Sequence, residues 1–256
     1  MIRALLPAGA AGADAFGDAP EGVLLPAEEA VVAGVAPGRR REFATVRHCA
    51  RRALRELAGR SPGPAPPPVA LLPDRDGVPR WPDGLVGSMT HTRGYRAAVV
   101  ARAADVARLG IDAEPDRPLR PGVLETIASP AERAALPGLI AHGPGGEAPG
   151  ACGTDAYGFG GDGFGGGGAV CGDRLLFCAK EAAYKAWFPH ARVLIGFRDV
   201  EVDFGGPASG GRFEARVRRA PGVLLRGRWG AGNGLLVAVV ATPADGARGS
   251  GADPGH

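Results

Sequence analysis

The sequence predicts an α+β fold in which two similar α+β halves form a pseudo-dimer with the active site at their interface. Three observations support this fold class. Helical segments repeat apolar residues at helical spacing, other segments combine strand composition with turn residues, and the order strand, helix, strands occurs twice. The halves are expected at 1–105 and 106–242, followed by a disordered tail over 243–256.

Composition excludes several classes of protein. The chain has 256 residues, enough for a large core, and its net charge of +3 gives no reason to expect a nucleic acid or a membrane surface as partner. No apolar run reaches the roughly 18 residues of a membrane-spanning helix, and the first apolar stretch is too short for a secretory signal. The 4 cysteines lack metal-site spacing, so we expect free thiols and a cytoplasmic location.

The first half is expected to contain a strand and a short turn or helix over 21–36, then a helix over 39–59. That helix has a single apolar face at helical spacing, formed by Phe43, Val46, Ala50, Leu54 and Leu57. A proline-rich connector follows over 61–68. Residues 85–90 and 95–102 then read as a hairpin with glycine in its turn.

The second half begins with a short strand over 106–113. Ser129-Pro130-Ala131-Glu132 has the N-cap, proline and glutamate of a helix start. Residues 143–172 are rich in glycine and read as a flexible insertion. A helix over 174–188 and several strands complete the half, at about 192–204, 212–218, 223–229 and 235–242.

Two acidic residues, Asp112 and Glu114, lie one residue apart in the strand that opens the second half. Alternate residues of a strand point to the same face, roughly 6–7 Å apart, so the two carboxylates repel each other and lose hydration together. A hard divalent cation with oxygen ligands would relieve this repulsion. The simpler alternative is two acids that face solvent at the end of a strand.

The helix over 174–188 adds Glu181 and Lys185, which share one face. A surface ion pair is the simplest interpretation of their spacing. The apolar residues around the pair nevertheless indicate a largely buried helix, and a buried Glu181 would supply a third carboxylate to the site of Asp112 and Glu114. Mg²⁺ commonly combines a few carboxylates with phosphate oxygens, which indicates a diphosphate or triphosphate substrate.

Positive charge in the first half matches such a substrate. Arg39 opens the first long helix, where backbone N–H groups also attract anions, and Arg47 lies further along, off the apolar face. Thr90 and His91 end a strand just before a turn, where a hydroxyl and an imidazole can bind a phosphate. Each feature alone also fits an alternative: a solvated helix face for the arginines and a structural role for the histidine.

Several segments together resemble the 4′-phosphopantetheinyl transferases, in particular the siderophore- and polyketide-associated branch. The two strongest are GIDAEP at 110–115 and FCAKEAAYKAWFP at 177–189. The others are REFATVRHCAR at 41–51, WPDG at 81–84 and GSMTH at 87–91. The matches run in order along the chain, which makes the resemblance specific.

The resemblance implies an enzyme that transfers the 4′-phosphopantetheine arm of coenzyme A to a serine of an apo acyl carrier or peptidyl carrier protein. Adenosine 3′,5′-bisphosphate is the product released. Mg²⁺ is the implied cofactor and coenzyme A the donor substrate, with no nucleic acid or membrane partner. Because one chain holds two similar halves, we expect a monomer.

The resemblance also implies roles for individual residues. Asp112 and Glu114 would hold Mg²⁺ with Glu181, which would be a metal ligand or the base that takes the serine proton. Lys185 would balance diphosphate charge, and Asp112, Glu181 and Lys185 form the expected catalytic set. The remaining expected coenzyme contacts are Thr90 and His91 at the 3′-phosphate, and the arginines Arg39, Arg47 and Arg75.

The chain departs from the family pattern in three places. Asp76 stands where relatives usually carry a basic residue before a Gly-x-Pro turn, and Arg75 comes one position earlier. Gly172 stands where relatives often carry tryptophan, and 143–170 looks inserted. The last two departures lie near where a carrier protein would dock, so they bear on partner preference.

Two other functions compete with this one. A coenzyme A or carrier-protein binding module without turnover is disfavoured because all three acids are present. A Mg²⁺-dependent phosphoesterase is disfavoured because the chain has no nucleophile motif for it and because that activity explains the basic helix less well.

Overall fold

The computed structural model describes residues 1–60, 67–140, 170–205 and 210–244. The first half contains η1 (Ile2–Leu5), β1 (Ala10–Ala15), α1 (Pro26–Val31), α2 (Pro37–Ala58), β2 (Leu85–Thr92) and β3 (Tyr95–Arg102). The second half contains β4 (Val106–Pro115), α3 (Val123–Ile127), α4 (Pro130–Ile140), α5 (Gly172–Ala191), η2 (Phe197–Asp199), β5 (Val200–Gly205), β6 (Gly210–Val217), β7 (Leu224–Gly232) and β8 (Leu235–Pro243).

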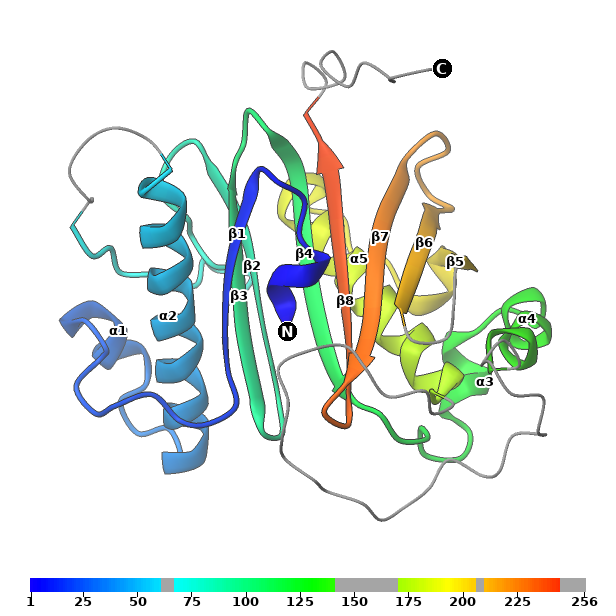
Figure 1. Ribbon diagram of the computed structural model, residues 1–256, viewed down its shortest axis with the longest axis horizontal. Coiled ribbons are helices and arrows are strands. Elements are labelled where there is room, and N and C mark those ends of the chain that lie inside the picture. Colours follow the sequence, from blue (N-terminus) through cyan, green and yellow to red (C-terminus); the bar gives the residue numbers. More distant parts are fainter. Residues whose placement is uncertain (61–66, 141–169, 206–209, 245–256) are drawn as a thin grey trace, which may run out of the picture.

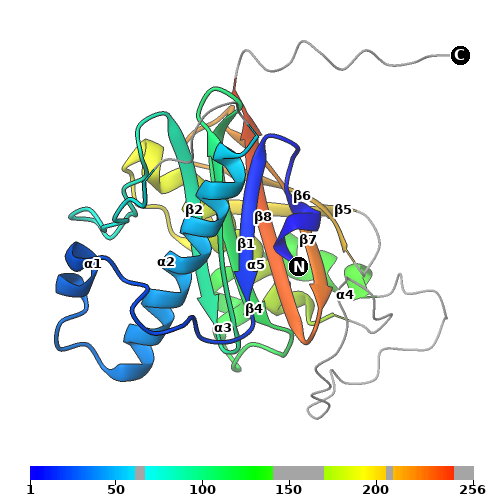
Figure 2. The ribbon, with the colours of Figure 1, turned by 60° about the vertical axis from the view of Figure 1, so that its left-hand side comes forward.

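Two antiparallel sheets form the centre of the molecule (Figure 1). The first has the strand order β1-β3-β2 and the second β4-β8-β7-β6-β5. Helix α2 packs on the first sheet, as Figure 2 shows, and α5 packs on the second. The inner faces of the two sheets share one apolar cluster. This order of layers, helix, sheet, sheet, helix, confirms the predicted α+β fold with two similar halves.

Alternation of side chains along β3 creates two of these layers. Ala98 and Val100 face α2, whereas Ala97 and Val99 join the cluster between the sheets. Both faces of the strand are therefore buried, which requires a run of small and apolar residues with no polar face.

Strand β4 places its acidic residues toward α5. Ile111 and Ala113 pack into the cluster between the sheets, so Asp112 points to the opposite side. At Gly110, a β-carbon would lie 2.2 Å from the Ala182 carbonyl oxygen, so α5 can approach β4 this closely only where there is no side chain. The close packing of α5 on β4 is thus built into the sequence around Asp112.

Most of the expected elements are confirmed. The helix over 39–59 is α2, the hairpin is β2 and β3, and the helix over 174–188 is α5. The expected capping box is present at the start of α4. There the Ser129 N–H donates to Glu132 Oε2 over 2.8 Å, and the Glu132 N–H donates to Ser129 Oγ over 3.2 Å.

Two strand predictions are wrong in part. Residues 21–36 contain helix α1 and no strand, because Pro26 starts the helix and Glu28 caps it by accepting the Leu25 N–H. Residues 192–199 are likewise not a strand, and β5 begins only at Val200. Arg192 ends α5 in a left-handed conformation with φ of 52°, which turns the chain away from an extended path.

The glycine-rich segment and the tail fall largely outside the described residues, so the predicted flexibility of 143–169 and disorder of 245–256 stay predictions. The described end of the segment is ordered: Val170 and Cys171 are buried, and Gly172 begins α5. Cys49 and Cys178 are free and buried. Cys171 is disulfide-bonded, so the prediction of free thiols is wrong for this residue.

Candidate active site

Asp112 is the centre of a polar cluster where the two halves meet. Its Oδ1 accepts hydrogen bonds from Thr90 Oγ1 at 3.0 Å and from Lys185 Nζ at 2.7 Å. Its Oδ2 is buried and has no hydrogen-bond partner among the residues that the structure describes. One carboxylate oxygen is therefore held in place and the other is available to a ligand.

Lys185 connects the second half to the first. Its Nζ lies 3.4 Å from Thr90 Oγ1 as well as bonding Asp112. Burial alone would lower the pKa of Lys185, but the charges of Asp112 and Glu181 and the hydrogen bond to Asp112 raise it above the ordinary value. Lys185 is thus a permanent cation at the seam between the halves.

Glu114 and Glu181 lie in the electrostatic field of Asp112. Burial raises the pKa of both carboxyl groups, and repulsion from Asp112 raises it further. Arg174 opposes this shift at Glu114, to which it donates over 3.0 Å, and Lys185 opposes it at Glu181. Excess negative charge therefore remains around Asp112.

The predicted metal ligands have suitable chemistry but do not form a compact cage. Within the described parts of the chain, no group of three or more His, Cys, Asp or Glu side chains lies close enough to hold a metal ion. The unpartnered Oδ2 of Asp112 and the raised pKa of Glu114 and Glu181 nevertheless fit a hard divalent cation with oxygen ligands. Such an ion would satisfy the buried oxygen and relieve the repulsion.

A cavity of about 840 Å³ opens beside Lys185, within the usual volume range of ligand-binding pockets. Its walls come from both halves: α2, the 73–81 segment and β2 on one side, and α5 with the residues after it on the other. The predicted coenzyme-binding residues that line it are Arg39, Arg47, Thr90, His91 and Lys185. The walls include aromatic surface as well as charge, from Phe43, Trp81, Tyr184 and Phe188.

Arg39 and His91 are neighbours in the lining of the cavity. The Arg39 guanidinium contacts His91 Nε2 and pairs with Glu42 over 3.1 Å. Burial lowers the pKa of His91, and the charge of Arg39 lowers it further. The imidazole is therefore mainly neutral near pH 7, and Arg39 supplies the charge that an anion would meet there.

Arg47 also lines this cavity and is largely buried. Its guanidinium carbon lies 3.4 Å from the centroid of the Phe43 ring, and its Nε donates to the Leu71 carbonyl over 3.3 Å. Burial lowers its pKa to about 10, so it keeps its charge at neutral pH. The ring and the carbonyl fix the orientation of this cation.

Three predicted coenzyme contacts do not line the cavity: Asp112, Glu181 and, on the exposed surface, Arg75. The Arg75 side chain is 93% exposed, and its Nε lies 3.7 Å from Asp76 Oδ2. The cavity wall instead contains Arg80 and Arg192, which the sequence analysis did not select. Arg192 bridges the halves by pairing with Asp74 at 2.6 Å and Asp76 at 3.1 Å. Only the position of Arg192 just after α5 could have suggested its role, because its partners are distant in sequence.

Comparisons with known proteins agree with this arrangement of two halves. A model described as the 4′-phosphopantetheinyl transferase N-terminal domain matches residues 27–101. A second model, described as the 4′-phosphopantetheinyl transferase superfamily, matches residues 108–219.

Three curated proteins are similar over nearly the whole chain. The 4′-phosphopantetheinyl transferase Svp of Streptomyces mobaraensis is 45% identical over 95% of this chain and 90% of its own length. The 4′-phosphopantetheinyl transferase PptT of Mycobacterium tuberculosis is 38% identical, over 94% of this chain and 97% of its own. The 4′-phosphopantetheinyl transferase Npt of Nocardia iowensis is 37% identical, over 94% of this chain and 99% of its own length.

Proposed function

The chain belongs to the 4′-phosphopantetheinyl transferase superfamily, and on that basis we propose that it transfers the phosphopantetheine arm of coenzyme A to a serine of an apo carrier protein. One observation carries the assignment of the site. Asp112 offers an unpartnered buried oxygen on β4 while its other oxygen is bound by Thr90 of the first half and Lys185 of the second. This polar cluster adjoins a cavity lined by cations from both halves.

Coenzyme A is proposed to lie in the cavity with its phosphates along these cations. Arg39, Arg47 and Lys185 supply positive charge, and Thr90 and His91 supply polar atoms for the 3′-phosphate. The aromatic walls are suited to the adenine ring. Of the predicted coenzyme contacts, Arg75 has the least structural support, because it lies outside the cavity wall and its side chain is almost fully exposed.

Mg²⁺ dependence is part of the proposal. Asp112, Glu114 and Glu181 would hold the ion, and the unpartnered Oδ2 of Asp112 supports this assignment. When bound, Mg²⁺ would neutralise charge on the diphosphate. Lys185, which donates to the other oxygen of Asp112, adds a second positive charge beside the site.

The proposed reaction is a displacement at the phosphorus that carries the pantetheine arm. The serine oxygen of the carrier forms a bond to this phosphorus, the bond to the bridging diphosphate oxygen breaks, and adenosine 3′,5′-bisphosphate leaves. Glu181 accepts the serine proton as the general base. Lys185 stabilises the negative charge that develops on the leaving oxygen.

Acyl carrier and peptidyl carrier proteins, including those of siderophore and polyketide biosynthesis, are the proposed partners. We propose a monomer because one chain supplies both walls of the cavity. The boundary between the two halves at residue 105 is likewise a proposal.

None of the described helices is long and apolar enough to cross a membrane. A cytoplasmic location is proposed as well, although the disulfide at Cys171 counts against the free-thiol argument for it.

One assay tests the function and separates it from its alternatives. The chain is incubated with coenzyme A, Mg²⁺ and an apo carrier protein, and the carrier is weighed by mass spectrometry. The proposal predicts one added phosphopantetheine arm per carrier serine. Binding of coenzyme A without this mass increase would indicate a binding module, and hydrolysis of coenzyme A without carrier would indicate a phosphoesterase.

A further inference from the structure

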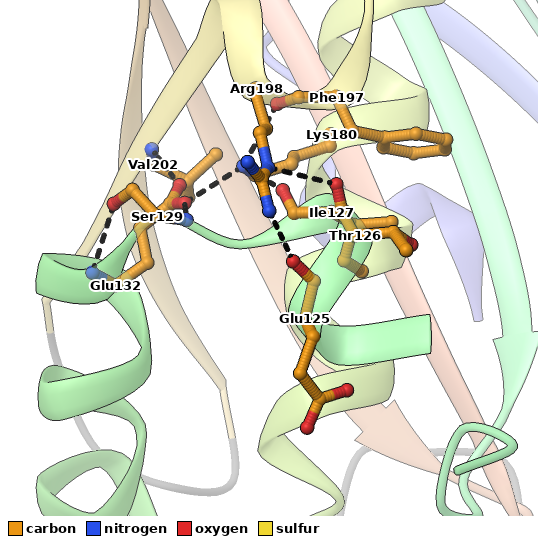
Figure 3. Close-up of polar contacts among 9 residues, drawn as sticks. All are labelled: Glu125, Thr126, Ile127, Ser129, Glu132, Lys180, Phe197, Arg198 and Val202. Carbon is orange, nitrogen blue, oxygen red and sulfur yellow. Dashed lines mark hydrogen bonds and ion pairs between the residues drawn. The ribbon is translucent and has the colours of Figure 1, made fainter. Parts of the chain in front are cut away.

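Lys180, the residue before Glu181, is buried in α5 and uses all of its hydrogen-bonding capacity (Figure 3). Its Nζ donates to the Ile127 carbonyl at 2.7 Å, to Glu132 Oε2 at 2.9 Å and to the Phe197 carbonyl at 2.9 Å. An ammonium group has three donors, so none is left for a substrate. Lys180 is therefore not itself a candidate to contact the reacting atoms.

Glu132, its partner, is equally buried and equally occupied. Its Oε2 also accepts the Ser129 N–H at 2.8 Å, and its Oε1 accepts the Val202 N–H at 2.8 Å. The Lys180–Glu132 pair thus joins four segments: the end of α3, the start of α4, the η2 turn and β5 are all tied to α5 at one point (Figure 3).

A second, smaller hollow of about 200 Å³ lies next to this pair. One wall is the α5 surface of Lys180, Glu181 and Tyr184, and the other is the segment of Ile195, Gly196, Phe197 and Val200. Lys180 binds the Phe197 carbonyl, and the Phe177 and Phe197 rings stack with centroids 5.3 Å apart. The pair therefore sets the distance between the two walls.

The hollow and the large cavity are neighbours along α5. Tyr184 lines both spaces, whereas Glu181 lines only the hollow and Lys185 only the cavity. The proposed base and the cation for the donor phosphates thus face different spaces on the same helix. This division suits a reaction in which donor and acceptor approach from two sides.

We propose that the Lys180–Glu132 pair is a positioning device that holds the 195–197 wall against α5, so that the acceptor serine meets Glu181 in the small hollow. This inference rests on the proposed transferase function. It adds an acceptor-side subsite and assigns Lys180 and Glu132 as positioning residues. Their effect comes from geometry, because the charge of Lys180 is balanced by Glu132 at 2.9 Å.

The test uses the double variant Lys180→Met/Glu132→Gln, which removes both charges and so avoids leaving one buried ion unpaired. Steady-state kinetics are measured separately for coenzyme A and for the apo carrier, and folding is checked by thermal melting. We expect kcat/KM for the carrier to fall at least tenfold while KM for coenzyme A changes less than twofold. A general loss of structure would lower kcat/KM for both substrates to the same extent.

Arg198→Ala is the matched control, because Arg198 donates to the Glu125 and Thr126 carbonyls and forms no hydrogen bond to Lys180 or Glu132 (Figure 3). Its carrier kinetics should stay within about twofold of the wild type. Phe197→Ala covers the case of an unfolded double variant, because it keeps both buried charges and removes only the wall's ring that stacks on Phe177. It should lower kcat/KM for the carrier severalfold.

Wild-type carrier kinetics in a folded double variant, or in Phe197→Ala, would overturn the inference while leaving the transferase function intact. An equal fall in kcat/KM for coenzyme A and for the carrier would also overturn the inference. If the wild-type chain transfers no arm in the same assay, the proposed function fails and this inference with it.

Discussion

Helix α5 carries two lysine–carboxylate pairs that differ in how completely they are satisfied. In the Lys180–Glu132 pair the side chains are 1% and 3% exposed, and all three lysine donors have partners. In the Lys185–Asp112 pair they are 29% and 7% exposed, and Asp112 Oδ2 has no partner among the described residues. One pair is closed to ligands and the other is open.

The difference distinguishes charges that only stabilise the fold from charges that can bind a ligand or take part in the reaction. A buried ion pair whose hydrogen bonds are complete can only hold segments in place, because a ligand would have to displace an existing bond. The open pair lies between carboxyl groups of raised pKa and a cavity lined with cations. Unsatisfied charge of this kind is typical of functional sites.

The largest effect is expected from removing the open carboxylate. Asp112→Ala should lower the transfer rate by roughly 10³-fold or more, because Lys185 and any bound cation lose their common partner. Initial rates of arm transfer, followed by the mass of the carrier, measure this. Glu214→Ala is the control, since Glu214 forms exposed ion pairs on β6 and should keep the wild-type rate.

Removing the proposed base should have the next largest effect. Glu181→Gln preserves the shape of the side chain but cannot accept the serine proton, so kcat should fall by roughly 10²–10⁴-fold. A wild-type kcat would remove Glu181 from the chemistry.

The closed pair should matter more than the open pair for stability, although the open pair matters more for activity. Lys180→Met leaves Glu132 charged and buried, and should lower the free energy of unfolding by about 3–5 kcal/mol. Lys185→Met should cost less, because its side chain is partly exposed and water can replace it. Urea unfolding of both variants measures the difference, and a larger loss for Lys185→Met would contradict the comparison.

A pH-dependent change in stability is the smallest expected effect. The pKa of Glu181 is raised above its ordinary value of 4.5 in the folded chain. A raised carboxyl pKa favours folding below the ordinary value, and this contribution is lost as pH rises through the folded pKa. Glu181→Gln should therefore melt higher than the wild type at pH 7.

The difference in melting temperature should shrink as the pH falls toward the ordinary glutamate pKa. Thermal melts of both proteins across this range test the sign. A difference that grows on acidification would mean that the pKa of Glu181 is lowered by folding.

Local signals predicted much of the fold. The capping residues Ser129 and Glu132, the apolar face of α2 and the glycine turn of the β2–β3 hairpin all lie within short segments. Strand β1 was not predicted because its sequence, AAGADA, has no strand-like residues and is buried by small side chains alone. Its place depends on pairing with β3, which is distant in sequence.

In the candidate site, too, features set by short segments were predictable and contacts between distant residues were not. Asp112, Glu181 and Lys185 were selected from their spacing and motifs, and the structure brings Asp112 and Lys185 into contact. The pairs Glu132–Lys180 and Glu114–Arg174 were not foreseen, because tertiary packing joins residues 48 and 60 positions apart. Glu132 looked like a capping residue only, and its second role depends on α4 meeting α5.

Calorimetric titration of Mg²⁺ into the chain with coenzyme A present tests the central claim most directly. The open pair should receive the ion and the closed pair should not. The account predicts that binding is lost in Asp112→Asn and retained in Lys180→Met/Glu132→Gln. Unchanged Mg²⁺ binding in Asp112→Asn would contradict it.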